Sequence, residues 1–121
     1  MNSNNERFIL LNKTKKFINN CDNIIINLPN KENSLRNNFK NELYTLLKNL
    51  MYYKDNYSIN IKSKYLMEYI INIDMIDYYL EECINKKYIS EKELKKTLKL
   101  LSELRSICLG IYKSIGIKWY L

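Results

Sequence analysis

The chain has 121 residues, of which 46% are hydrophobic and 27% charged, with only two glycines and one proline. This length suits one domain spanning residues 1–121, and the scarcity of helix breakers favours a mostly helical chain. Histidine is absent, which excludes His-based triads and imidazole metal sites, and there is no run of about 18 apolar residues that would predict a membrane span.

The net charge of +7 comes from 20 Lys and Arg against 13 Asp and Glu. A basic surface attracts phosphate backbones and anionic membranes. The other explanation is codon usage, because Asn, Lys, Ile and Tyr are abundant while Ala, Val and Gln are absent. No signal peptide is predicted, and the widely spaced Cys21, Cys83 and Cys108 are typical of reduced core thiols in a cytoplasmic protein.

The first two predicted helices are separated by the only proline. Apolar residues recur every seven positions between residues 5 and 28, as in a helix bundle, and Pro29 ends this helix. The second helix is expected over residues 31–55. Its apolar stripe consists of Leu35, Phe39, Leu43, Leu46, Leu50 and Tyr53. The polar segment "KDNYSINI" is expected to form a loop before the third helix.

The third helix, expected over residues 62–85, is apolar on two sides. One side carries Leu66, Ile70, Ile73, Leu80 and Ile84, with Asp77 in the same stripe. The other side carries Met67, Ile71, Met75, Tyr78 and Tyr79. Because a helix that is apolar all round usually buries two faces, we expect this second side to be an oligomer interface. The alternative is that its tyrosines simply cover the surface.

The fourth helix, expected over residues 90–115, opens with a capping box in which Ser90 and Glu93 exchange hydrogen bonds. It is expected to end near Ser114 or Gly116, followed by an apolar tail. Short loops favour antiparallel neighbours, so the predicted fold is all-α, an antiparallel up-down-up-down four-helix bundle.

Lysines on the outward side of this helix are the candidate binding site. Lys92, Lys95, Lys96 and Lys99, called the lysine stripe below, cluster opposite the apolar residues, and only Glu103 follows them on the same face. Any amphipathic helix has a charged side, but this one is poorly compensated. The predicted nucleic-acid-binding residues are Lys86, Lys87, Lys92, Lys95, Lys96 and Lys99. Lysine contacts to phosphate carry no base information, so binding without sequence specificity is expected.

The acidic residues and cysteines give little support to catalysis. Asp74 and Asp77 lie one turn apart, but such pairs more often act as caps or ion-pair partners. Arg105 is expected to lie across from Asp74, either as a partly buried ion pair or as a side chain whose stem packs while its head reaches water. We therefore expect no enzyme activity, no catalytic residue, no metal site and no cofactor.

Three segments resemble a known family. "NLPNKENSLRNNF" resembles the start of the second helix in small four-helix-bundle proteins, with Pro29, Glu32 and Leu35 in the matching positions. "IDMIDYYLEECINKKYIS" is similar to their third helix and its Ser-capped linker, and "SELRSICLGIYKS" to their closing segment. Together, over residues 12–114, they resemble the accessory variability determinant (Avd) of diversity-generating retroelements. In the related ribosomal-RNA intervening-sequence proteins a Ser-Ile-Pro segment marks the second helix, where this chain has "LYTLLKNLMYYKD".

The resemblance implies a cytoplasmic homopentamer that binds RNA and DNA and associates with a reverse transcriptase during mutagenic cDNA synthesis, without being a catalyst itself. The family's third helix is often arginine-rich, whereas this one carries Glu68, Glu81 and Glu82. The first interpretation is therefore a nucleic-acid-binding accessory protein for a reverse transcriptase. The alternatives are a helical adaptor that acts through protein contacts, a protein of the ribosomal-RNA intervening-sequence type, and a defence or toxin–antitoxin component with a hidden activity.

Overall fold

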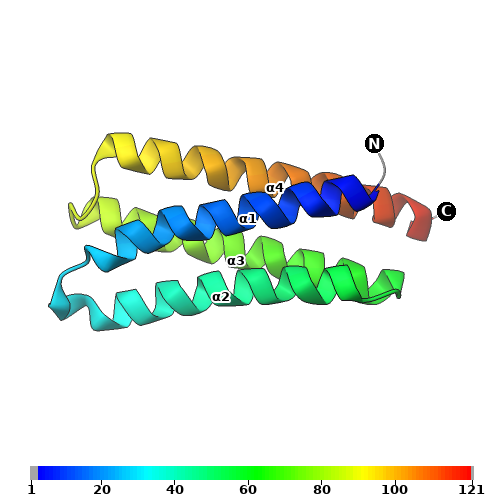
Figure 1. Cartoon of the computed structure of the whole chain (residues 1–121), viewed down its shortest axis with the longest axis horizontal. Coiled ribbons are helices and arrows are strands. Elements are labelled where there is room, and N and C mark those ends of the chain that lie inside the picture. Colours follow the sequence, from blue (N-terminus) through cyan, green and yellow to red (C-terminus); the bar gives the residue numbers. More distant parts are fainter. Residues whose placement is uncertain (1–2, 121) are drawn as a thin grey trace.

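The computed structural model describes the backbone of residues 3–120 and the side chains of residues 8–115. Its elements are α1 (Ser3–Ile26), a 3-10 turn η1 (Asn30–Glu32), α2 (Asn33–Asp55), α3 (Ile59–Asn85) and α4 (Glu91–Tyr120). The four helices lie along one axis and alternate in direction, so that both chain ends lie at the same end of the bundle (Figure 1). Each helix packs against two others, α1 and α3 both against α2 and α4. The predicted all-α, up-down-up-down bundle is confirmed.

Several helix ends differ from the predicted ones; α2, for example, begins at Asn33 because Asn30–Glu32 form the turn η1. α1 stops at Ile26, because the residue before a proline disfavours helical geometry, and its last turn tightens as the Leu28 N–H donates to the Ile25 carbonyl at 3.1 Å. α3 begins at Ile59, within the expected loop, where the Ser58 carbonyl accepts the first helical hydrogen bond from the Lys62 N–H at 2.9 Å. α4 runs on to Tyr120 through the expected tail, whose side chains lie outside the described residues.

The end of α3 is a Schellman motif with a lysine where glycine is usual. The Tyr88 N–H donates to the Cys83 carbonyl at 2.8 Å and the Lys87 N–H to the Ile84 carbonyl at 3.0 Å. This places Lys87 in the left-handed region, with φ of 63°. The motif turns the chain sharply enough for α4 to start only six residues after α3 ends, at Glu91.

The core consists of the apolar stripes that the sequence pattern predicts, with one change of phase. Asp77 is exposed and Ile76 is fully buried in its place. The cysteines are free and buried, as predicted, and burial raises the pKa of Cys83 to about 11 and of Cys108 to about 12.

Buried polar pairs join the helices and fix their register. Across the core from α1 to α3, the Tyr69 and Thr14 hydroxyls lie 2.7 Å apart, both fully buried. Between α2 and α3, the Asn49 amide donates to the Asn72 side-chain oxygen at 2.7 Å. Among the described residues, no buried side-chain nitrogen or oxygen lacks a hydrogen-bond partner. Such satisfied pairs favour one alignment of the helices, because sliding a helix by a turn would leave them unpaired.

Candidate nucleic-acid interface

The direction of the lysine stripe is set where α4 begins. The Ser90 hydroxyl accepts a hydrogen bond from the Glu93 N–H at 3.1 Å, and the Ser90 carbonyl accepts one from the Leu94 N–H at 3.0 Å. This half of the predicted capping box is confirmed. It starts the helix at a fixed residue, so that Thr97, Leu101 and Leu104 turn into the core.

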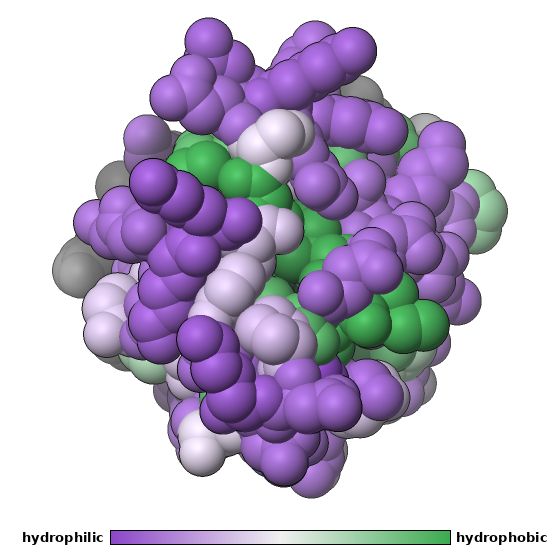
Figure 2. Space-filling model, turned by 90° about the vertical axis from the view of Figure 1, so that its left-hand side faces the viewer, coloured by the Kyte–Doolittle hydropathy of each residue, from purple (hydrophilic) through white to green (hydrophobic). Residues whose placement is uncertain are grey.

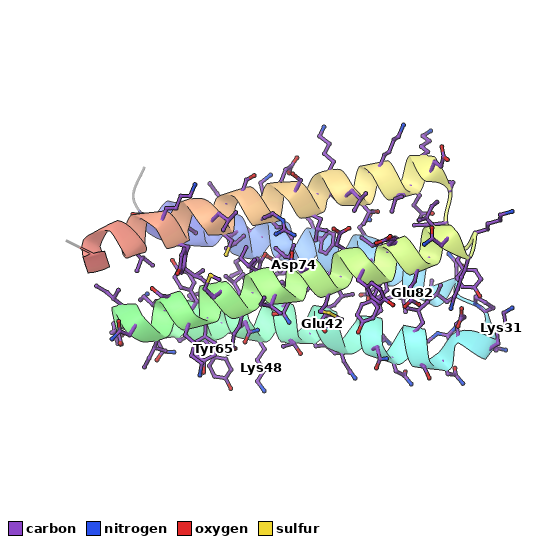
Figure 3. All side chains as sticks on the ribbon, turned by 180° about the vertical axis from the view of Figure 1, so that it is seen from behind. Lys31, Glu42, Lys48, Tyr65, Asp74 and Glu82 are labelled. Atoms are coloured by element: carbon purple, nitrogen blue, oxygen red, sulfur yellow. The ribbon has the colours of Figure 1, made fainter. Side chains whose placement is uncertain are left out.

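The four lysines of the stripe are all exposed on the opposite side of α4. Figure 3 shows side chains tipped with nitrogen projecting from the outer side of this helix into solvent. Within residues 8–115, whose side chains are described, no carboxylate forms an ion pair with any of the four. The stripe is therefore a row of four exposed ammonium groups outside ion-pair distance of the described carboxylates.

Glu103, the acid that follows the stripe, is turned toward α1. Its carboxylate lies 3.2 Å from the ammonium of Lys13. Both side chains are about two-fifths exposed, at 43% for Lys13 and 39% for Glu103. The ion pair links α1 to α4 and engages Glu103, the acid one helical turn after Lys99.

Lys86, which was predicted to extend the patch, differs from the stripe. Its ammonium lies 3.1 Å from the Glu32 carboxylate and 3.8 Å from that of Glu82. The hydrogen bond that Lys86 donates to Glu32 raises the pKa of Lys86, while the hydrogen bonds that Glu32 accepts from the Tyr88 hydroxyl and from Lys86 lower the pKa of Glu32. The positive charge of Lys86 is thus already compensated, and the extension of the patch rests on Lys87, which is exposed.

This ion-pair cluster lies at the end of the bundle that carries the α1–α2 and α3–α4 connections. Figure 2 looks onto this end and shows hydrophilic side chains over most of it, with an apolar strip between them. The strip marks where the core reaches the surface beneath the connections. At this end Lys86 pairs with Glu32 and Glu82, whereas the lysines of the stripe stand together along α4.

The predicted contact between Arg105 and Asp74 is present. The Arg105 guanidinium donates to the Asp74 carboxylate at 2.5 Å, between α4 and α3. The side chains are 35% and 51% exposed, so this is a surface pair rather than a partly buried one. Figure 3 shows Asp74 at the seam of the two helices. Asp77 is not part of this contact.

The outer side of α3 is apolar and exposed, with one exception among the predicted interface residues. Met67 is 41% exposed, Ile71 57%, Met75 37% and Tyr78 52%. Tyr79, in contrast, is only partly exposed and stacks on Phe39 of α2 with 5.7 Å between ring centroids. Tyr79 thus packs at the seam between α2 and α3, and its part in an oligomer interface stays a prediction. α3 is also acidic, with two lysines against five carboxylates over Ile59–Asn85.

Two further features were not predicted from the sequence. A groove of about 310 Å³ lies between α1 and α4, and its lining consists of Phe8, Ile9, Asn12, Lys13, Lys16, Leu100 and Glu103. At the seam of α2 and α3, the Tyr52 and Tyr65 rings stack with 4.7 Å between centroids, and the Lys48 ammonium lies 5.8 Å from the Tyr52 ring centroid. A signal for the groove was present, because four consecutive apolar residues, Phe8 to Leu11, cannot all face the core from one helix.

Comparison with known proteins supports the fold. The chain is similar in structure to a protein of unknown function from the S23 ribosomal protein family of Bacteroides thetaiotaomicron, with a TM-score of 0.82 and 15% sequence identity. The match covers 89% of this chain and 98% of that one. No protein-family model and no curated protein matches the sequence.

The likeness extends over almost the whole bundle, so the four-helix arrangement is shared. At 15% identity it says nothing about the function of the surface lysines. In the described part of the chain, no helix is long and apolar enough to cross a membrane. The same part holds no cluster of three or more cysteine, aspartate or glutamate side chains with the geometry of a metal site.

Proposed function

We propose that this protein is a non-catalytic nucleic-acid-binding protein of the cytoplasm that holds phosphate groups on the lysine stripe. The observation that carries the proposal is the absence of ion-pair partners for the four stripe lysines among residues 8–115. Exposed ammonium groups that no carboxylate neutralises attract a polyanion, and their counterions are released when it binds.

The dimensions of the stripe agree with a short run of phosphates. From Lys92 to Lys99, α4 advances about 10 Å at about 1.5 Å per residue. One strand of a B-form duplex presents a phosphate about every 3.4 Å along its axis. One copy of the stripe therefore spans roughly three phosphates, which gives weak binding that several copies in an oligomer would strengthen.

The biological setting has two candidates. The sequence resemblance supports an accessory protein of a retroelement reverse transcriptase, acting in mutagenic cDNA synthesis. The structural likeness to an S23 ribosomal protein family member favours the ribosomal-RNA intervening-sequence type instead. A neighbouring gene for a reverse transcriptase with a template repeat supports the first, and a gene position inside a ribosomal-RNA insertion supports the second.

The test of nucleic-acid binding uses two variants of equal charge. The first changes the four stripe lysines to Gln. The control changes four exposed lysines elsewhere, Lys31, Lys40, Lys48 and Lys64, to Gln. Both variants have a net charge of +3, because each loses four of the +7 charges.

Binding of an RNA oligonucleotide is measured by fluorescence anisotropy at several salt concentrations. We expect the stripe variant to lose most of the affinity, and its plot of log Kd against log salt to flatten by up to about 3 for a single strand. The control variant should keep most of the affinity. Equal losses in the two variants would show that only net charge matters and would remove the role of the stripe.

The outer face of α3 supports a second candidate, binding to protein. Met67, Ile71, Met75 and Tyr78 form an exposed apolar row, which is typical of an interface between subunits or with a partner. Light scattering distinguishes the cases: we expect an oligomer, a homopentamer by the family resemblance, and Ile71→Glu should dissociate it. A monomer at micromolar concentration would contradict the subunit interface and leave an adaptor role for this face.

A further inference from the structure

We infer that the groove between α1 and α4 receives an unpaired base, so that the protein binds single-stranded rather than double-stranded nucleic acid. This inference rests on the proposed function, because it concerns the same ligand. It adds a base-binding site that the lysine stripe alone does not provide.

The groove combines an apolar floor with a charged rim. Phe8, Ile9 and Leu100 supply its apolar surface, while Asn12, Lys13, Lys16 and Glu103 supply the polar groups. Its volume of about 310 Å³ lies at the lower end of the range of roughly 300–1,000 Å³ typical of small-molecule sites. It is therefore suited to one small flat group rather than to a protein helix.

The groove adjoins the lysine stripe. The α4 wall of the groove consists of Leu100, one helical turn after Lys96, and Glu103, one turn after Lys99, so each lysine lies one turn from a lining residue. Lys16, which is exposed, lines the groove from α1. Figure 1 shows α1 and α4 running side by side along this seam. A ligand in the groove would thus have cations on both sides of it.

Interactions between α1 and α4 hold the walls in place. The Asn20 amide donates to the Thr97 hydroxyl at 2.8 Å, and the Lys13–Glu103 ion pair crosses from one wall to the other. Phe8 is not held in the core and is 66% exposed. The groove is therefore preformed, with an aromatic ring free to stack on a ligand.

A nucleotide with an unpaired base has the matching chemistry. Its phosphate is anionic, its base has a flat apolar face, and the base edge can exchange hydrogen bonds with an amide such as that of Asn12. In a duplex the faces of the bases are stacked on one another, so no base face is available to enter a groove. The combination of an apolar groove with flanking lysines thus favours a single strand.

The test compares Phe8→Ala with a matched control, Tyr44→Ala. Tyr44 is similarly exposed, at 58%, and lies on α2, which does not pack against α4. Three probes are used: a mixed-sequence single-stranded RNA oligonucleotide, the same sequence as a duplex, and inorganic polyphosphate, which has charge but no bases. Thermal unfolding followed by circular dichroism checks that both variants fold.

We expect Phe8→Ala to weaken single-strand binding by roughly tenfold, within the 5- to 150-fold that loss of one stacked base produces. Its binding to the duplex and to polyphosphate should stay within about twofold, and Tyr44→Ala should match the wild type throughout. Equal weakening for all three probes, or no weakening for the single strand, would overturn the inference. If Phe8→Ala instead abolished binding to vesicles of anionic lipid while RNA binding stayed the same, a membrane ligand would replace it.

A second variant keeps the aromatic ring. Phe8→Trp should bind the single strand at least as well as the wild type does, and RNA should quench its emission by more than that of the wild type, which contains Trp119, while polyphosphate should not. Absence of this additional quenching at saturating RNA would show that no base stacks at this position. The two proposals can be refuted separately. If the stripe variant loses RNA binding while Phe8→Ala binds like the wild type, only the role of the groove is refuted. If Phe8→Ala loses single-strand binding while the stripe variant keeps its affinity, only the role of the stripe is refuted.

Discussion

Thr14 and Tyr69 share a buried hydrogen bond, and we expect substitutions at the two residues to lower the free energy of unfolding by different amounts. The Thr14 hydroxyl donates to the Leu10 carbonyl at 2.7 Å, so the proton it shares with Tyr69 must come from the tyrosine. Both side chains are fully buried, and burial raises the pKa of Tyr69. Removing the acceptor therefore has a different consequence from removing the donor.

Thr14→Val leaves the Tyr69 hydroxyl buried without an acceptor, at a loss of about 1–3 kcal/mol in the free energy of unfolding. Tyr69→Phe removes the donor but leaves the Thr14 hydroxyl bonded to Leu10, so the expected loss is only about 0.5–1.5 kcal/mol. The double variant has no unpaired donor. It should therefore be more stable than Thr14→Val alone.

Urea unfolding followed by circular dichroism measures the three free energies. A loss of about 2 kcal/mol shifts the midpoint by roughly 1 M, at about 2 kcal/mol per M of urea. Losses in the double variant that equal the sum of the single losses would refute the assignment of donor and acceptor. If the slope of the free energy of unfolding against urea is the same in all variants, the losses of stability do not come from a changed denatured state.

Three further predictions concern the ends of helices and the core. Lys87→Gly should raise the free energy of unfolding by about 0.5–1 kcal/mol in urea titrations, because glycine adopts positive φ without the strain of about 1–2 kcal/mol that a side chain causes there; a loss of stability would contradict the Schellman geometry. Because the pKa of Glu32 is lowered in the folded protein, its carboxylate stabilises the fold fully above the ordinary pKa of 4.5, and this stabilisation is lost as the pH falls through the lower folded value. The free energy of unfolding of Glu32→Gln, measured against pH, should therefore fall less steeply in acid than that of the wild type. Cys83 and Cys108, with pKa values raised to about 11 and about 12, should resist iodoacetamide at pH 8 in the folded protein and react after unfolding, as mass spectrometry would detect; fast labelling of the native chain would refute their burial.

Much of the bundle was predictable because its large apolar residues repeat at helical spacing. The capping signal at Ser90 located the start of α4 to within one residue, and the antiparallel register placed Arg105 across from Asp74. These features depend on local chemistry and on helix spacing, which a sequence shows directly.

Other features depend on packing, which the spacing does not determine. A strict seven-residue repeat places Asp77 in the core stripe of α3, but the buried face steps by three residues from Ile73 to Ile76. Tyr79 lies near the edge of that face, and only contact with Phe39 decides that it packs inward. The pairing of Lys86 with Glu32 joins residues 54 positions apart, so no local pattern indicates it.

The acidity of α3 has a consequence for how the molecule meets a polyanion. In a protein of net charge +7, this one helix carries more carboxylates than lysines. The resulting charge asymmetry favours an approach in which the outer side of α4, rather than that of α3, meets the polyanion. The exposed apolar row that includes Met67, Ile71 and Met75 would then remain accessible after the nucleic acid has bound. Nucleic acid and a protein neighbour need not compete for the same side of the bundle.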